Sequence, residues 1–181
     1  MPRLIKLQDG QAIEAEDIFA DVADEEAIPA GPVILSLARF QAEGDALVSA
    51  GQAVGVRIQP DEAVEDLAYD LPRLALVALV FPKYGDGRAY SSASLLRQRL
   101  KYAGEVRAVG DVLREQALFM MRCGFDSFVP ADGSGPQDWA ATAHRYRHVY
   151  QPAQDARAPA FAERQSPLSP LRGQLSQRER I

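Results

Sequence analysis

The sequence predicts an α/β fold with an open parallel sheet of about four or five strands and short βα units. Short β-prone runs recur along the chain, and they start near Val33, Val54, Ala75, Val106 and Ser127. Helical patterns lie between these runs, and alternating strands and helices favour parallel strands joined by right-handed crossovers. The run Leu74–Phe81 is apolar throughout, as expected of a strand buried on both faces. Two arrangements stay open, a flavodoxin-like sheet and part of a (β/α) barrel.

The composition fits one globular domain. The chain has 181 residues, of which 47% are hydrophobic and 25% charged, close to globular averages. Its single cysteine excludes an internal disulfide, a Cys₄ zinc site and a Cys-x-x-Cys pair. The longest apolar run is far shorter than the roughly 20 residues that span a bilayer. Residues 1–8 lack the apolar segment of a secretory signal. We therefore expect a soluble, cytoplasmic protein.

Charge is distributed unevenly along the chain. Residues 1–82 hold 15 acidic and 5 basic side chains, whereas residues 83–122 hold 4 acidic and 8 basic ones. The overall charge of −5 disfavours binding to nucleic acid or to an anionic membrane. The positive block suits a small anion or an acidic protein face, although scattered surface arginines would give the same count.

The N-terminal residues predict a β-hairpin over residues 4–13. Two apolar runs flank Asp9-Gly10, a pair favoured in two-residue turns because it tolerates positive φ. An acidic stretch, Glu14–Glu26, follows without a clear element. The βα core is expected over residues 31–130, inside a single domain of residues 1–152.

A few residues predict where helices begin and end. Gly104 and Gly124 stand where a left-handed C-cap would lead into a strand, and Asp111 is a natural N-cap. A final helix is predicted over residues 137–150. Residues 153–181 hold three prolines and one aromatic residue, so we expect them to form a disordered tail.

The spacing of the strands points to a candidate site. Successive strand starts are 21, 21, 31 and 21 residues apart, so one unit carries about ten extra residues. The sequence assigns these extra residues to a loop over residues 82–92, directly after the most buried strand. Ligands of open parallel sheets bind beyond the carboxyl ends of the strands. This loop is therefore the first place where we expect a ligand.

The backbone of the loop favours an anion. Gly85 and Gly87 allow main-chain N–H groups to approach a ligand closely. Ser91 or Ser92 can cap a helix that starts near Ala93, whose N-terminus offers free N–H donors.

The side chains of the loop add charge. Lys83 supplies a point charge and Arg88 a planar fork that suits an oxyanion, while Asp86 can orient Arg88. Sulfite, sulfate, phosphate or a carboxylate would fit, and a solvated Gly-Asp-Gly turn is the structural alternative. The residues predicted to bind the ligand are Lys83, Asp86, Gly87, Arg88, Tyr90, Ser91, Arg107, Asp111 and Arg114.

Other reactive residues favour structural roles. Cys123 has the surroundings of a buried small hydrophobe. His144 and His148 have a metal-chelating spacing, but no His-Glu-x-x-His pattern accompanies them, and packing at the surface is the favoured interpretation. No dinucleotide or Walker motif is present, and no cofactor or metal site is evident. A hydrolase or lyase that uses Asp86 or Asp111 as its base is a weaker hypothesis.

A series of short motifs resembles a known family. The motifs are Phe81-Pro82-Lys83, Asp86-Gly87-Arg88, Tyr90-Ser91, Leu95-Leu96-Arg97, the run from Gly104 to Arg114, and Arg122-Cys123-Gly124-Phe125-Asp126. This series is similar to the bacterial "domain of unknown function nine-three-four" family, often labelled a probable oxidoreductase of sulfite reduction. The likeness is strong over residues 75–130, looser over residues 1–74 and absent from the tail. One departure is Ala89, where the family pattern has glycine.

The resemblance implies a role in sulfur assimilation. Members are commonly encoded beside assimilatory sulfite reductase, and that neighbourhood is the main basis of the label. No catalytic residue carries over from the family. Two functions follow as expectations: an accessory protein of sulfite reduction, of the oxidoreductase class, and a non-catalytic binding module that partners sulfite reductase.

Overall fold

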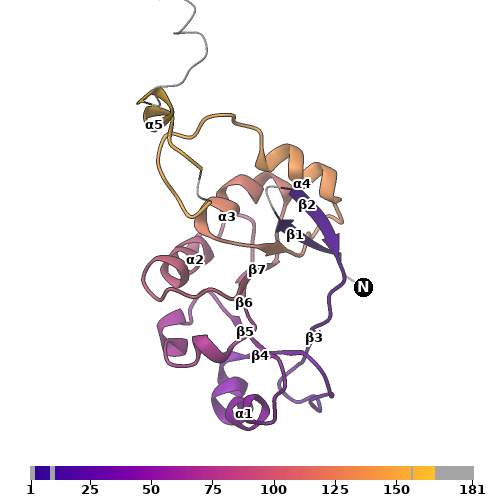
Figure 1. Cartoon of the computed structure of the whole chain (residues 1–181). Coiled ribbons are helices and arrows are strands. Elements are labelled where there is room, and N and C mark those ends of the chain that lie inside the picture. Colours follow the sequence, from indigo (N-terminus) through magenta and orange to yellow (C-terminus); the bar gives the residue numbers. More distant parts are fainter. Residues whose placement is uncertain (1–2, 9–10, 156, 166–181) are drawn as a thin grey trace, which may run out of the picture.

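Eight strands form one sheet at the centre of the molecule (Figure 1). The computed structural model describes residues 3–8, 11–155 and 157–165. The strands are β1 (Leu4–Gln8), β2 (Gln11–Ala15), β3 (Ala20–Asp21), β4 (Val33–Ser36), β5 (Val54–Ile58), β6 (Leu76–Phe81), β7 (Glu105–Gly110) and β8 (Ser127–Phe128). The prediction of four or five strands in the sheet was therefore too low, because the predicted hairpin joins the sheet at one edge and the unpredicted strand β3 extends the other.

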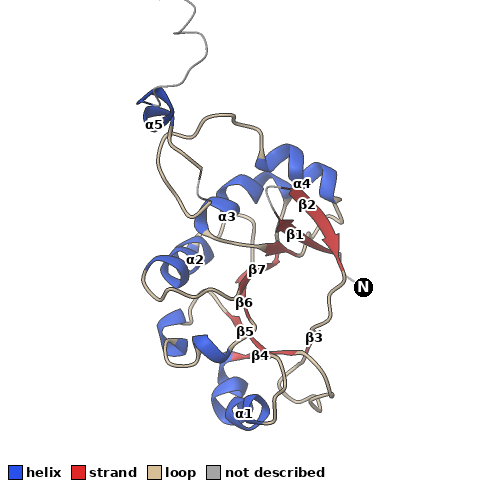
Figure 2. Ribbon diagram, viewed as in Figure 1, coloured by secondary structure: helices blue, strands red, loops and turns tan. Residues whose placement is uncertain are grey.

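Most helices lie in the connections between the strands, and the last two, α4 and α5, follow β8 (Figure 2). They are α1 (Leu37–Ser49), η1 (Val64–Leu67), η2 (Leu71–Arg73), α2 (Arg88–Gln98), η3 (Arg114–Gln116), α3 (Ala117–Cys123), α4 (Pro136–Ala143) and α5 (Ala160–Gln165), where η marks a 3₁₀ helix. Across the described part of the chain, none of the helices has the length and apolar character needed to cross a membrane.

The strand order follows the chain. It runs β2-β1-β8-β7-β6-β5-β4-β3, with parallel neighbours from β3 to β8 and β1 antiparallel to β8. A flavodoxin-like sheet reverses its order beside the first strand, so that alternative is wrong. An unreversed order with right-handed crossovers brings the helices to one face, as in part of a (β/α) barrel. Figure 1 shows α1, α2 and α3 along one side of the strands and the chain from β2 to β3 along the other.

The extra residues between β6 and β7 form a helix rather than a loop. The unit from β5 to β6 contains only the short 3₁₀ helices η1 and η2, whereas the unit from β6 to β7 contains the 11-residue helix α2. The connection between β6 and α2 is confined to residues 82–87. The predicted long loop over residues 82–92 was therefore wrong in extent, although its position after β6 is right.

The N-terminal hairpin is confirmed. β1 pairs with β2 antiparallel from Leu4 opposite Ala15 to Gln8 opposite Gln11. The predicted Asp9-Gly10 turn lies outside the described residues. The hairpin joins the main sheet, because Ile5 and Lys6 pair with β8.

The two faces of the sheet differ in chemistry. The face beneath the helices carries the main apolar core, in which Phe128 stacks on Trp139 with ring centroids 4.5 Å apart. The opposite face holds only a small apolar cluster of Ile34, Leu76 and Ala78. Strand register also brings several polar residues into one row across this face: Lys6, Ser127, Arg107, Arg57 and Ser36, with Ala78 in the middle.

Some predicted helix ends are confirmed and others are wrong. Gly124 ends α3 with φ +101°, as predicted. Gly104 is not a left-handed cap, because α2 ends earlier and Lys101 takes the positive φ of +55°. Asp111 does not cap a helix either, since η3 begins only at Arg114.

The C-terminal residues also differ from the prediction. The helix expected over residues 137–150 ends at Ala143, so His144 and His148 are not one turn apart on a helix. The segment expected to be a disordered tail contains α5, which follows a β-bridge between Val149 and Pro159. Residues 166–181 lie outside the described residues.

Candidate functional site

The connection between β6 and α2 contains a closed ion pair. Arg88 donates from Nε and Nη2 to the two carboxylate oxygens of Asp86, at 3.1 and 2.7 Å. The backbone N–H of Arg88 also donates to Asp86, at 3.1 Å. Because Arg88 hydrogen-bonds this carboxylate, the pKa of Asp86 falls to about 2. Asp86 therefore orients Arg88, as the sequence suggested, and also neutralises part of its charge.

Helix α2 begins earlier than predicted. It starts at Arg88, so Ser91 and Ser92 lie inside the helix and neither is its N-cap. The side chain of Asp86 accepts the N–H of the first helical residue instead. Aspartate serves this purpose well, because a carboxylate satisfies an orphan donor and complements the helix dipole.

The loop glycines are less constrained than predicted. Neither Gly85 nor Gly87 has a positive φ. A Cβ at Gly85 would meet nothing within 4 Å, and one at Gly87 would only touch Tyr90 at 4.0 Å. The backbone at these two positions therefore does not depend on glycine, and the predicted close approach of a ligand to their N–H groups stays a prediction.

The loops after β6 and β7 are tied together. The carboxylate of Asp111 accepts the backbone N–H of Tyr84 at 2.7 Å, and Gln116 donates to the carbonyl of Tyr84 at 3.2 Å. Gly110 makes this approach possible, because its φ is +96° and a Cβ there would clash with the carbonyl of Phe81. Asp111 thus reaches the predicted edge, where its carboxylate holds the backbone of the neighbouring loop.

The remaining predicted residues of the loop region are dispersed. Lys83 is exposed and forms no ion pair with any described residue. Tyr90 is half-buried, its ring edge-on to Phe81 at 5.2 Å, and burial raises the pKa of its hydroxyl to about 12. Arg114 pairs with Glu115 at 3.3 Å and Asp138 at 3.6 Å. The structure therefore brings Asp86 and Arg88 together, whereas Arg114 is paired with other carboxylates.

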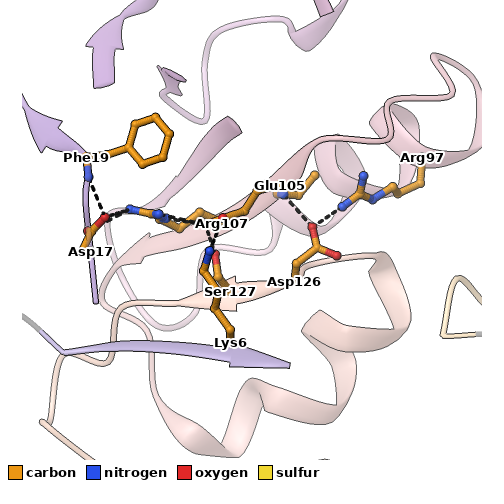
Figure 3. A network of polar contacts seen from close by, with 9 residues as sticks. Lys6, Asp17, Phe19, Arg97, Glu105, Arg107, Asp126 and Ser127 are labelled. Atoms are coloured by element: carbon orange, nitrogen blue, oxygen red, sulfur yellow. Dashed lines mark hydrogen bonds and ion pairs between the residues drawn. The ribbon is translucent and has the colours of Figure 1, made fainter. Parts of the chain in front are cut away.

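Arg107 lies away from this edge, in a buried network on the opposite face of the sheet (Figure 3). Its side chain is 2% exposed. Nη1 donates to both oxygens of Asp17 at 2.9 Å, and Nε donates to Glu105 at 2.9 Å. The guanidinium also lies 5.7 Å from the ring centroid of Phe19. The expectation that Arg107 joins the loop residues at one edge is therefore wrong.

Glu105 is the centre of this network. It accepts hydrogen bonds from Lys6 and Ser127, each at 2.7 Å, besides the one from Arg107. Burial alone would raise the pKa of Glu105, but these hydrogen bonds and the charge of Arg107 outweigh it, so the pKa is lowered. The buried charges are thus balanced by direct partners, which is the condition for tolerating them in a core.

A second group, at the amino ends of β7 and β8, is structural. Arg97 donates to the carbonyls of Gly124, Tyr102 and Gly104 at 3.0, 2.6 and 2.8 Å, and pairs with Asp126. Asp126 also accepts the N–H of Val106 at 2.8 Å (Figure 3). This clamp joins the end of α2 to the start of two strands.

Sequence reasoning missed most of these networks. Glu105 and Arg107 are two residues apart in a strand, so their side chains share a face. The alternation of side chains along this strand could therefore have predicted that one of its two faces is polar. Asp17 lies about ninety residues away in the sequence, and no local pattern points to it.

A hollow of about 570 Å³ lies beside α2 and α3 and is lined by Tyr90, Ser91, Ser94 and Cys123, among others. Burial raises the pKa of the Cys123 thiol, so the less reactive protonated form is favoured at neutral pH. Among the described residues, no group of three or more His, Cys, Asp or Glu side chains is placed to hold a metal ion.

A family model described as "Bacterial protein of unknown function (DUF934)" matches residues 55–161. The chain belongs to this family. The DUF934 match extends from β5 into α5 and includes the connection between β6 and α2, whereas Asp17 and the hairpin lie outside it. No curated protein matches the chain.

Proposed function

We propose that this DUF934 protein is a cytoplasmic accessory protein of assimilatory sulfite reduction that binds a small oxyanion at the connection between β6 and α2. The observation that supports the oxyanion is the orientation of Arg88. Its Nε and Nη2 face Asp86, which leaves Nη1 and one proton of Nη2 directed away from that carboxylate. A fixed arginine with a free edge suits two oxygens of sulfite or sulfate. Lys83, exposed on the same connection, adds positive charge.

The place in sulfite reduction comes from the family resemblance of the motifs from Phe81 to Asp126. The oxyanion site would lie at the carboxyl edge of parallel strands, where such sheets bind their ligands. The geometry favours binding over general-base chemistry. Asp86, with a pKa of about 2, is a weak base at neutral pH, and Asp111 is engaged by a backbone N–H. The hydrolase or lyase hypothesis is therefore disfavoured.

Calorimetric titration of the protein with sulfite, and separately with sulfate and phosphate, tests the oxyanion site. Arg88→Ala should abolish sulfite binding and leave the melting temperature almost unchanged, since the side chain is 58% exposed. Arg99→Ala is the matched control, because Arg99 is an exposed arginine at the other end of α2. Retention of sulfite binding by Arg88→Ala would show that the site lies elsewhere.

Asp86→Asn gives the opposite test at the same site. Removing the carboxylate charge should strengthen sulfite binding several-fold, because less of the positive charge of Arg88 is then neutralised. If both substitutions weaken binding equally, Asp86 and Arg88 act only as a helix-capping pair and the oxyanion proposal is wrong.

A second candidate function is a binding module that partners sulfite reductase. An exposed aromatic surface at the C-terminal end of the described chain favours it. Copurification of the two proteins, with kinetics of the reductase measured with and without this protein, would separate this function from an independent turnover of sulfite.

A further inference from the structure

Four large aromatic side chains are exposed near the C-terminal end of the described chain. They are Phe119, Tyr146, Tyr150 and Phe161, each at least 57% exposed. Phe119 is on α3 and Phe161 on α5, and the two tyrosines belong to the irregular segment between α4 and α5. Exposed aromatic side chains that gather in one place mark interaction sites more often than single ones do.

These residues belong to one surface, which we call the aromatic surface. A hollow of about 270 Å³ is lined by Phe119, Tyr146 and Tyr150 together with Val149. Helix α5 is fixed beside it, because the N–H of Ala160 donates to the carbonyl of Val149 at 2.8 Å. Phe161 is the second residue of that helix. Three of the four aromatic side chains thus line a shaped depression, and the fourth, Phe161, is on the helix beside it.

Exposed arginines neighbour the aromatic residues in the sequence: Arg145 and Arg147 flank Tyr146, and Arg164 is on the same helix as Phe161. Arg145, Arg147 and Arg164 are exposed, and none of them forms an ion pair with a described residue. The nearby acidic groups are already engaged: Asp155 pairs with Arg122 at 3.2 Å, and Glu163 pairs with His148 at 2.6 Å. The unpaired charges next to these aromatic residues in the sequence are therefore cationic.

We propose that the aromatic surface binds an acidic amphipathic segment of a partner protein. Apolar side chains of that segment would fill the hollow between Phe119 and Tyr150, and its carboxylates would meet Arg145 and Arg147. Aromatic residues and arginine are the residue types enriched where protein partners bind most strongly. A nucleic acid or an anionic membrane fits less well, because each carries many more negative charges than a short acidic segment and is opposed more strongly by the chain's net charge of −5. The proposal is independent of the oxyanion site, which uses other residues.

A defined peptide tests the proposal. A fluorescent peptide of about 16 residues, with leucine on one helical face and glutamate on the other, is titrated with the full chain at two salt concentrations. We expect binding that weakens as salt rises. Phe119→Ala combined with Tyr150→Ala should weaken it roughly tenfold or more, as for truncated interface anchors. Arg145→Glu combined with Arg147→Glu should weaken it and remove most of its salt dependence.

Controls make each outcome decisive. Tyr69→Ala removes an 88% exposed aromatic residue outside the aromatic surface and should leave binding unchanged. The charge-reversal variant retains the aromatic side chains, and the aromatic variant retains the arginines. If one of the two variants fails to fold, the other still tests the proposal. The proposal is overturned if the unchanged protein does not bind the peptide, if both variants still bind, or if Tyr69→Ala is equally damaging. Preferential binding of a single-stranded oligonucleotide or of phosphatidylglycerol vesicles would assign the surface to a different class of partner and overturn it too.

Discussion

The buried arginine of β7 shows how a single charged residue is accommodated in this fold. Arg107 is surrounded by the sheet, Phe19 and two carboxylates, and its side chain is almost inaccessible to water. An arginine in this position loses its hydration and is stable only while its partners are present.

Arg107→Ala should therefore lower the free energy of unfolding by roughly 3–5 kcal/mol, the usual cost of breaking a buried ion pair. The substitution leaves Asp17 without a charged partner and removes one partner of Glu105. Urea denaturation measures the change, and Arg99→Ala serves as an exposed-arginine control. A loss below about 1 kcal/mol would mean that the network contributes no more than a surface pair.

Glu105 predicts a dependence of stability on pH. Its pKa in the folded protein is lowered, so the folded state binds this proton less readily than the unfolded state does. The stabilisation is present above the unfolded pKa of about 4.3 and is lost as the pH falls through the folded value. Glu105→Gln should flatten the acid side of the stability curve. Parallel curves for the two proteins between pH 7 and pH 3 would contradict this.

The same residues show what the sequence could reveal about the site. The Asp86–Arg88 interaction was predictable, since the two residues are local and complementary. The hydrogen bond from the backbone of Tyr84 to Asp111 was not predictable, because it depends on how closely the ends of β6 and β7 approach each other. The position of Arg107 required knowing that the acidic stretch crosses the free face of the sheet.

At the scale of elements, the tight junction at the end of β7 is the most constrained point. Gly110 combines a φ of +96° with no space for a side chain beside the backbone of Phe81. This junction places Asp111 where it can hold Tyr84.

Gly110→Ala should destabilise the protein by at least about 1–3 kcal/mol, the cost of holding a residue with a Cβ in a sparsely populated conformation, with the steric clash in addition. Gly85→Ala is the matched control and should be tolerated, since a Cβ there meets open space. Thermal unfolding of the two variants measures the difference. Equal melting temperatures would show that the junction relaxes without cost.

Strand positions were predicted better than the connections between them. The observed strands begin at Val33, Val54, Leu76, Glu105 and Ser127, within one residue of the predicted starts. Apolar β-prone runs are a local signal, so they survive without knowledge of the fold. The two-residue strand β3 has no such run, and its pairing with β4 depends on tertiary contacts. The 3₁₀ helices η1 and η2 likewise gave no periodic pattern long enough to recognise.

At the scale of the whole molecule, the uneven charge of the sequence is partly neutralised within the fold. Acidic residues before β4 meet basic residues on later strands: Asp17 pairs with Arg107, and Asp21 pairs with Arg57. The acidic stretch thus covers the polar row on the free face of the sheet. The formal charge of each half therefore overstates the charge that is free at the surface.

Substituting Asp17→Asn together with Asp21→Asn should loosen this stretch while the central strands stay intact. We expect hydrogen exchange at the amides of Ala20 and Val22, which bond to the chain at β4, to become at least about tenfold faster, as local opening becomes less costly. Amides of β6 should be unaffected. Uniform acceleration in both regions would show that the acidic stretch unfolds only with the entire domain.

The position of β1 has a consequence for synthesis on the ribosome. Strands β4 to β8 each pair with a strand that has already emerged, so the sheet can grow in the order of translation. The hairpin emerges before the other strands of this sheet, yet its neighbour in the sheet is β8, which is completed only at Phe128. A nascent chain that stops short of this residue holds two strands with an unsatisfied edge, and such edges promote aggregation. Closure of the hairpin onto the sheet is therefore a late event, although β1 is synthesised well before β8.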